Sequence, residues 1–232
     1  MNFEKKTSED LRTTLLAELL VLELLSKILY TYPDQKFLQQ LYGNDLFQEI
    51  PFAGAQGSTV AGLKLLRSWD EGNRNQLGFS ILDDLRADYT RLFHNTKGLP
   101  ISPWESVYFG KERSLFEKST LDVRNWYRRF GLRIENQGHE PDDHIGLELA
   151  FVSQLARLAL VAMEEDDQAK FQNILEAKRR FLVEHPLKWV PLWAMQMQEY
   201  GKTDFYRGIA LVTKGVLLEL AAILELDVPG EV

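Results

Sequence analysis

The sequence predicts an all-α protein of about ten helices, folded as a single globular domain over residues 1–232. Apolar residues recur at helical spacing, as Leu15, Leu19, Leu22 and Leu25 do near the N-terminus. No period-2 alternation of useful length occurs, and no Asn-Gly pair signals a hairpin. No fixed-period repeat is visible, which argues against a solenoid.

Caps and prolines predict where the helices begin and end. Thr7 or Ser8 can cap the first helix, and Pro33 stops it. Pro141 fits the first turn of a long helix that extends to about Met163. In chain order, the expected helices cover about 8–31, 35–42, 58–70, 76–93, two helices within 111–130, then 141–163, 167–185, a kinked segment over 187–200 that contains Pro191, and 203–226.

Two connections are long for a helical protein. They cover residues 93–111 and 131–143, whereas loops between packed helices usually hold about two to eight residues. Long ordered connections tend to carry function, so we expect the functional residues there. Residues 43–57, with Pro51 and three glycines, are also expected to form a loop.

Composition excludes several classes of function. The chain has 27 Lys and Arg against 34 Asp and Glu, and its net charge of -7 disfavours nucleic acid and anionic lipid as partners. No cysteine is present, which excludes disulfides, thiol catalysis and thiolate metal sites. The N-terminus lacks the pattern of a secretory signal, and charges interrupt the longest apolar stretches of the chain, as Glu18, Glu23 and Lys27 do near its start. We therefore expect a cytoplasmic protein with no integral membrane segment.

Motifs for catalysis or phosphate binding are missing from the sequence. There is no GxSxG nucleophile elbow, no GxxxxGK[ST] loop and no GxGxxG segment. We expect a protein that is not an enzyme and that binds no cofactor.

Acidic residues gather in the second long connection and the helix after it. Residues 134–156 contain five acidic residues and no Lys or Arg. Such a field suits a guanidinium group, because carboxylates accept the arginine fork in bidentate fashion. Two alternatives remain open: aspartates here could simply complement a helix N-terminus, or His139, Asp143 and His144 could form the site of a metal-dependent hydrolase. We expect no metal, because the pattern matches no defined motif.

Aromatic residues characterise the first long connection. Two prolines stiffen residues 100–109 and present Trp104, Tyr108 and Phe109 at little entropic cost. Trp104 can serve there either as a lid over the core or as a platform for a partner.

Three segments carry a resemblance to a known family. DYTRLF (88–93), SPWESV (102–107) and EPDDHIGLEL (140–149) occur in an order and spacing that resemble the TorD/DmsD/NarJ family of redox-enzyme maturation chaperones. The resemblance implies an all-helical fold and binding of the twin-arginine signal peptide of a molybdenum-cofactor oxidoreductase catalytic subunit, which is held until cofactor insertion and folding are complete. It implies a leader-binding pocket of Pro103, Trp104, Glu105, Ser106, Glu140, Pro141, Asp143 and His144, supported by Tyr89, Phe93 and Glu148.

The sequence leaves other properties open. A purely structural assembly factor, which would bind the mature enzyme and ignore the leader, is a further candidate. The chain could be a monomer or a domain-swapped dimer, and the client oxidoreductase is not named by any motif. Guanine-nucleotide binding has been proposed within the family, but this sequence has no phosphate loop to support it.

Overall fold

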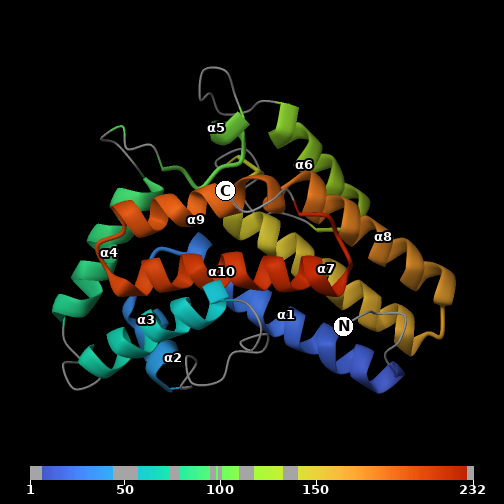
Figure 1. The fold of residues 1–232 in the computed structure, drawn as a ribbon, viewed down its shortest axis with the longest axis horizontal. Helices are drawn as coiled ribbons and strands as arrows, with labels where there is room; N and C mark the ends of the chain where they lie inside the picture. Colours follow the sequence, from blue (N-terminus) through green and yellow to red (C-terminus); the bar gives the residue numbers. More distant parts are fainter. Residues whose placement is uncertain are drawn as a thin grey trace. The chain divides into compact units, whose positions relative to one another are not determined.

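The described part of the chain is helical, as predicted. The computed structural model describes residues 7–43, 57–73, 79–94, 98, 101–109, 118–132 and 141–228. Within these ranges there is no strand, and the β-bridge between Trp104 and His144 is isolated. Figure 1 labels the ten helices: α1 (Ser8–Tyr30), α2 (Gln35–Gly43), α3 (Gly57–Asn73), α4 (Phe79–Phe93), α5 (Ser106–Phe109), α6 (Lys118–Arg129), α7 (Ile145–Glu164), α8 (Gln168–Glu184), α9 (Pro186–Tyr200) and α10 (Asp204–Ile223).

The residues divide into two compact units. The first comprises Met1–Tyr30, Trp104–Trp189 and Leu217–Val232, and the second comprises Thr31–Pro103 and Val190–Val216. Helices α9 and α10 each contribute residues to both units. The expectation of a single domain stays a prediction.

Helix α7 is the core of the first unit. It packs against α1 and α8 (Figure 1). Its apolar residues extend around the whole helix, and such a helix is normally buried. By length and composition α7 could cross a membrane, although the sequence expectation was that charge interrupts the apolar stretches. Because 72% of its apolar window is buried inside the protein, its role as a core helix accounts for that composition.

Close contacts hold α1 and α8 in the same unit. The Thr7 hydroxyl accepts a hydrogen bond from the Asp10 N–H at 3.1 Å, so Thr7 caps α1. Gly146 lets α7 approach α1, since a Cβ at this position would lie 2.8 Å from the Tyr30 Cβ. Between α1 and α8, Lys178 Nζ donates to Glu18 at 2.9 Å, and neither side chain is exposed.

The second unit contains α2, α3, α4 and parts of α9 and α10. Helices α3 and α10 approach closely, because a Cβ on Gly62 would lie 2.6 Å from the Gly208 carbonyl oxygen. Asp88, in the DYTRLF segment, is 2% exposed and accepts hydrogen bonds from the Lys202 and Thr203 N–H groups at 3.0 and 2.7 Å. Asp88 thus satisfies backbone donors just before α10, where a helix has unpaired N–H groups.

Two helix predictions need correction. Pro141 does not lie in the first turn of α7, because His144 is the N-cap and Ile145 is the first helical residue. Within residues 111–130, where two helices were expected, the described residues form one helix, α6, and residues 110–117 lie outside the described part. The short helix α5 was not anticipated, since its residues were assigned to a long connection.

Candidate functional site

Two of the three segments that carry the resemblance, SPWESV and EPDDHIGLEL, are joined in the first unit through residues 104–106 and 143–144. Trp104 and His144 form an antiparallel bridge, and the Glu105 N–H donates to the Asp143 carbonyl oxygen at 3.0 Å. This pairing connects the loop before α5 to the three residues before α7. Backbone bonds of this kind fix the spacing of the side chains on both segments.

The Asp143 side chain reinforces the connection. Its carboxylate accepts the Ser106 N–H at 2.7 Å on one oxygen and the Thr120 hydroxyl at 2.8 Å on the other. Asp143 has no exposed surface. Both donors are buried, so the carboxylate pairs groups that would otherwise be costly to bury. Asp143 therefore ties the start of α5 and α6 to the start of α7.

His144 occupies the N-terminus of α7. Its Nδ1 accepts the Gly146 N–H at 3.0 Å, which assigns the ring proton of the neutral form to Nε2. The ring makes edge-on contacts with Tyr30 and Trp104, with centroid separations of 5.2 and 6.1 Å. His144 is thus a helix cap enclosed by aromatic rings.

Four buried carboxyl groups lie close together near the Trp104–His144 bridge. This acid cluster consists of Glu105, Asp142, Asp143 and Glu148, each at most 3% exposed. Burial raises the pKa of the Tyr127 hydroxyl well above its ordinary value, and the negative charge of all four carboxyl groups raises it further. Arg124 pairs with Asp142, and the Tyr127 hydroxyl donates to the Asp142 carbonyl oxygen at 2.9 Å.

Glu148 and Glu105 link the cluster to more distant helices. Trp189 Nε1 donates to Glu148 Oε2 at 3.1 Å, and Glu105 Oε2 lies 2.8 Å from His185 Nδ1. Burial raises the pKa of Glu148 well above its ordinary value, and the charges of Glu105 and Asp143 raise it further. Glu148 therefore holds its proton to a higher pH than an exposed glutamate.

Aromatic side chains lie at the surface beside the acid cluster. Trp104 and Tyr108 are half-buried, and Phe109 is 53% exposed. Tyr108 packs against Trp189 with a centroid separation of 5.1 Å. The site therefore combines buried negative charge with a partly exposed aromatic surface on one short segment.

The remaining predicted residues divide into three groups. Pro141 is buried and precedes Asp142 in the first unit. Tyr89 and Phe93 are buried in the second unit, where their rings stack at 4.5 Å, and Pro103 is the last residue of that unit's first segment. Glu140 and His139 lie outside the described residues.

Sequence reasoning missed five residues of the site that make polar contacts with its carboxyl groups or backbone. They lie on α6, at the end of α8 and on α9, and are Thr120, Arg124, Tyr127, His185 and Trp189. Asp142 was recognised as one of the acids but not as a site residue. No local pattern marks any of the five, because each is defined by a contact across the fold.

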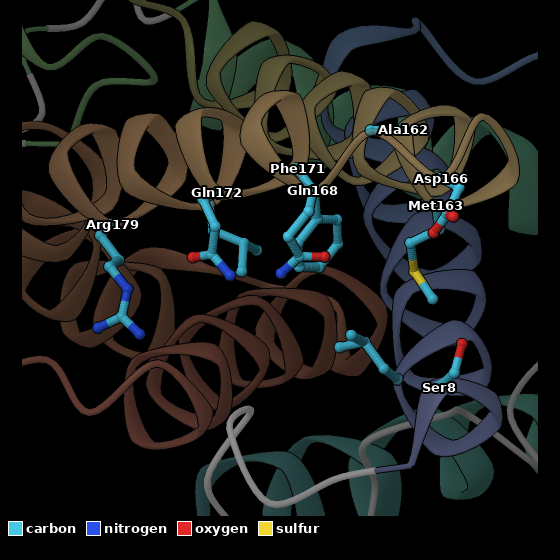
Figure 2. Close-up of a pocket in the computed structure, with 10 residues that line it drawn as sticks. Ser8, Ala162, Met163, Asp166, Gln168, Phe171, Gln172 and Arg179 are labelled. Carbon is cyan, nitrogen blue, oxygen red and sulfur yellow. The ribbon is translucent and has the colours of Figure 1, made fainter.

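A separate cavity lies at the other end of α7. It has a volume of about 300 Å³ and is bounded by the start of α1, the end of α7 and one face of α8. Figure 2 shows Gln172 and Arg179 reaching into it from α8 and Met163 from α7. At 1.5 Å per residue, the cavity and His144 are roughly 27 Å apart along α7, so the cavity is not part of the site above.

Comparison with known proteins places the chain in a family. The model of the family described as "Nitrate reductase delta subunit" matches residues 63–195, which is more than half of the chain. A probable Tat proofreading chaperone DmsD from Haemophilus influenzae is 30% identical over 146 residues, covering 63% of this chain and 64% of the relative.

Two further relatives carry similar names. The chaperone protein TorD from Photobacterium profundum is 28% identical over 53% of this chain and 56% of its own length. The Tat proofreading chaperone DmsD from Salmonella typhi is 40% identical over 32% of this chain and 36% of its own length. The chain thus matches less than two thirds of the length of each of these relatives.

Proposed function

Because the chain belongs to the TorD/DmsD/NarJ family of redox-enzyme maturation chaperones, we propose that it is a chaperone without catalytic activity. In this proposal it binds the twin-arginine signal peptide of a molybdenum oxidoreductase catalytic subunit in the cytoplasm. It holds that subunit until cofactor insertion and folding are complete.

One observation carries the proposal. Two segments almost forty residues apart are joined by the bridge between Trp104 and His144, with the acid cluster directly behind it. A twin-arginine leader has two guanidinium groups followed by an apolar stretch. It therefore calls for negative charge beside an apolar surface, the combination that helix-in-groove recognition uses.

The residues of the site divide into two roles in this proposal. The buried residues position the two segments, and all of them except Pro141 take part in the hydrogen bonds described above. They are Glu105, Ser106, Pro141, Asp143 and His144. Trp104 is half-buried and contacts the leader directly. Glu140, outside the described residues, remains a predicted leader-binding residue.

Negative charge acts at a distance even where the carboxylates are enclosed. Charges interact more strongly in the protein interior than in water because the effective dielectric constant is lower. In the acid cluster, Glu148 holds its proton to a higher pH and Arg124 pairs with Asp142, so Glu105 and Asp143 contribute most of the negative field. Its field therefore favours a cationic peptide at the adjacent surface.

Calorimetry with two synthetic leaders tests the proposal. One peptide carries the Arg-Arg pair and the other carries Lys-Lys in its place. We expect the first to bind with a micromolar Kd or tighter, about -8 kcal/mol, and the second to bind more weakly, because lysine cannot form the bidentate fork. Equal binding of the two, or no binding of either, would refute leader recognition through arginine.

A pull-down separates leader binding from general assembly. Full-length client subunit and a leader-deleted form are offered to the immobilised chain. Capture of the full-length form alone supports the proposal, whereas equal capture of both indicates an assembly factor that recognises the mature enzyme.

A further inference from the structure

His185, at the end of α8, lies between two carboxylates. Its Nδ1 is hydrogen-bonded to Glu105, and its Nε2 lies near Asp122. The residue is 2% exposed, and its ring packs against Phe181 at a centroid distance of 4.8 Å. Nδ1 lies 2.8 Å from Glu105 Oε2, so an ionised Glu105 accepts the proton on Nδ1. In that tautomer Nε2 carries a lone pair.

His185 Nε2 lies close to Asp122, which is on α6. Among the described residues, the buried Nε2 has no hydrogen-bond partner, and the nearest carboxylate oxygen is Asp122 Oδ2 at 3.6 Å. This separation is too long for a hydrogen bond. A lone pair and a carboxylate facing one another repel unless a cation lies between them.

The separation fits a metal ion. Two ligand atoms about 2.0–2.2 Å from a tetrahedral zinc ion lie roughly 3.3–3.6 Å apart. Glu184 offers a third donor within reach, since one oxygen of Asp122, one of Glu184 and one ring nitrogen of His185 all lie within 4.8 Å of one another, and binding would draw them to ligand spacing. Arg180 donates to Glu184 at 3.1 Å and would have to move aside.

We propose that Asp122, Glu184 and His185 bind one divalent transition-metal cation, with zinc as the matching probe. One imidazole and two carboxylates suit a borderline cation such as zinc. Glu105 completes the arrangement from behind, because a carboxylate on the far ring nitrogen orients a ligating histidine and raises its basicity. None of these three ligands belongs to the His139, Asp143 and His144 cluster of the hydrolase alternative.

The site is an accessible one and does not hold the fold together. The Asp122 side chain is 55% exposed, and three protein ligands leave a fourth position for water. The chain is therefore expected to fold without metal and to take up zinc from solution. The proposal does not depend on leader binding.

Zinc titration of the untagged, EDTA-treated chain tests the proposal. We expect one zinc ion per chain with micromolar affinity by calorimetry. Asp122→Asn and Glu184→Gln should each weaken binding at least tenfold without loss of helicity. Glu176→Gln, an exposed glutamate on α8, and His139→Gln should bind as wild type does.

Nitrogen-15 NMR of the histidine rings locates the bound ion. Zinc should shift the His185 Nε2 resonance, leaving that of His144 unchanged. Three results would each overturn the proposal: no saturable binding, equal affinity in Asp122→Asn and wild type, or loss of binding in His139→Gln. A His185 Nε2 that keeps a proton in the presence of zinc would also overturn it, because the proton would then be the cation facing Asp122.

Discussion

Asp143 shows how one buried carboxylate can fix the geometry of a site without touching solvent. Its two oxygens satisfy one backbone and one side-chain donor from different segments. Removing the side chain would leave two buried donors without partners, each of which costs about 1–3 kcal/mol. Those two hydrogen bonds hold Ser106 and Thr120 against the start of α7.

Substitution of Asp143 separates charge from positioning. In Asp143→Asn the amide oxygen can still accept the Ser106 N–H, and its NH₂ group can donate to Thr120. We expect a near-normal melting temperature and an Arg-Arg leader affinity about tenfold lower, roughly 1.4 kcal/mol, because one negative charge is gone. Asp143→Ala should melt well below both.

Thermal melts and calorimetry on the two variants provide the check. If Asp143→Asn binds the leader as tightly as wild type does, the charge has no part in recognition and Asp143 only positions the segments. If Asp143→Asn also melts far below wild type, the amide does not replace the hydrogen bonds of the carboxylate. The lower leader affinity would then result from a disturbed structure and not from the lost charge.

The raised pKa of Glu148 predicts that the free energy of unfolding depends on pH. Its folded pKa is raised above the ordinary value of 4.5. The stabilisation from its protonated form is therefore fully present below about pH 4.5 and is lost as the pH rises through the folded pKa. Glu148→Gln keeps the hydrogen-bonding shape of the protonated acid but cannot ionise.

The variant should therefore become progressively more stable than wild type above about pH 5. The difference should grow by at most about 1.4 kcal/mol per pH unit until the folded pKa is reached. Urea unfolding at pH 5 and pH 8 measures it, with the exposed Glu176→Gln as control. A difference that stays constant between the two pH values would show that Glu148 ionises normally in the folded chain.

At the scale of elements, the loop and short helix over residues 101–109 combine two tasks. Glu105 and Ser106 face inward, while Phe109 faces solvent and Trp104 is half-buried. Trp104 contacts the His144 ring edge-on. A tryptophan in this position can act as a lid over the core or as a platform for a partner, and the two alternatives predict different measurements.

Trp104→Ala distinguishes the two alternatives. We expect leader affinity to fall by roughly 2 kcal/mol or more, as for an anchoring aromatic, with a smaller loss of stability. A buried core tryptophan would instead cost about 3–5 kcal/mol of unfolding free energy. A large drop in melting temperature with leader affinity intact would identify Trp104 as a lid.

Helix positions were predictable because their signals are local. The periodicity of Leu15 to Leu25 and the cap at Thr7 lie within α1 itself. The start of α7 was not predictable, because a histidine N-cap is unusual and Pro141, three residues before His144, carries a stronger helix-start signal. The proximity of the two motif segments came from the family resemblance.

Contacts of the site with the rest of the fold could not be predicted. The hydrogen bonds of Thr120 with Asp143, Trp189 with Glu148 and His185 with Glu105 span 23, 41 and 80 residues. A single sequence records no signal at such separations. The buried state of Asp143 was likewise hidden, because aspartates near a helix start are usually exposed.

At the scale of the whole molecule, net charge shapes how a basic peptide approaches. A chain of net charge -7 attracts a leader with two arginines before any specific contact forms. Such attraction between exposed charges is screened beyond about 8 Å at physiological ionic strength. Contacts made by buried groups are screened much less, so the salt dependence of binding distinguishes the two contributions.

Binding of the leader should stabilise the whole chain. A ligand that binds only the folded state adds about 2.7 kcal/mol to the unfolding free energy at a hundredfold excess over its Kd. We expect this increase with the Arg-Arg leader, measured by urea unfolding with and without peptide, and a smaller one with the Lys-Lys leader at the same concentration. Raising the salt concentration should weaken binding of the Arg-Arg leader less than binding of the Lys-Lys leader. Recognition of the Arg-Arg leader depends on the low-dielectric acid cluster and not only on net charge. Identical stabilisation by the two peptides, lost equally in high salt, would mean that the acidic surface attracts any cationic peptide and that the site does not read arginine.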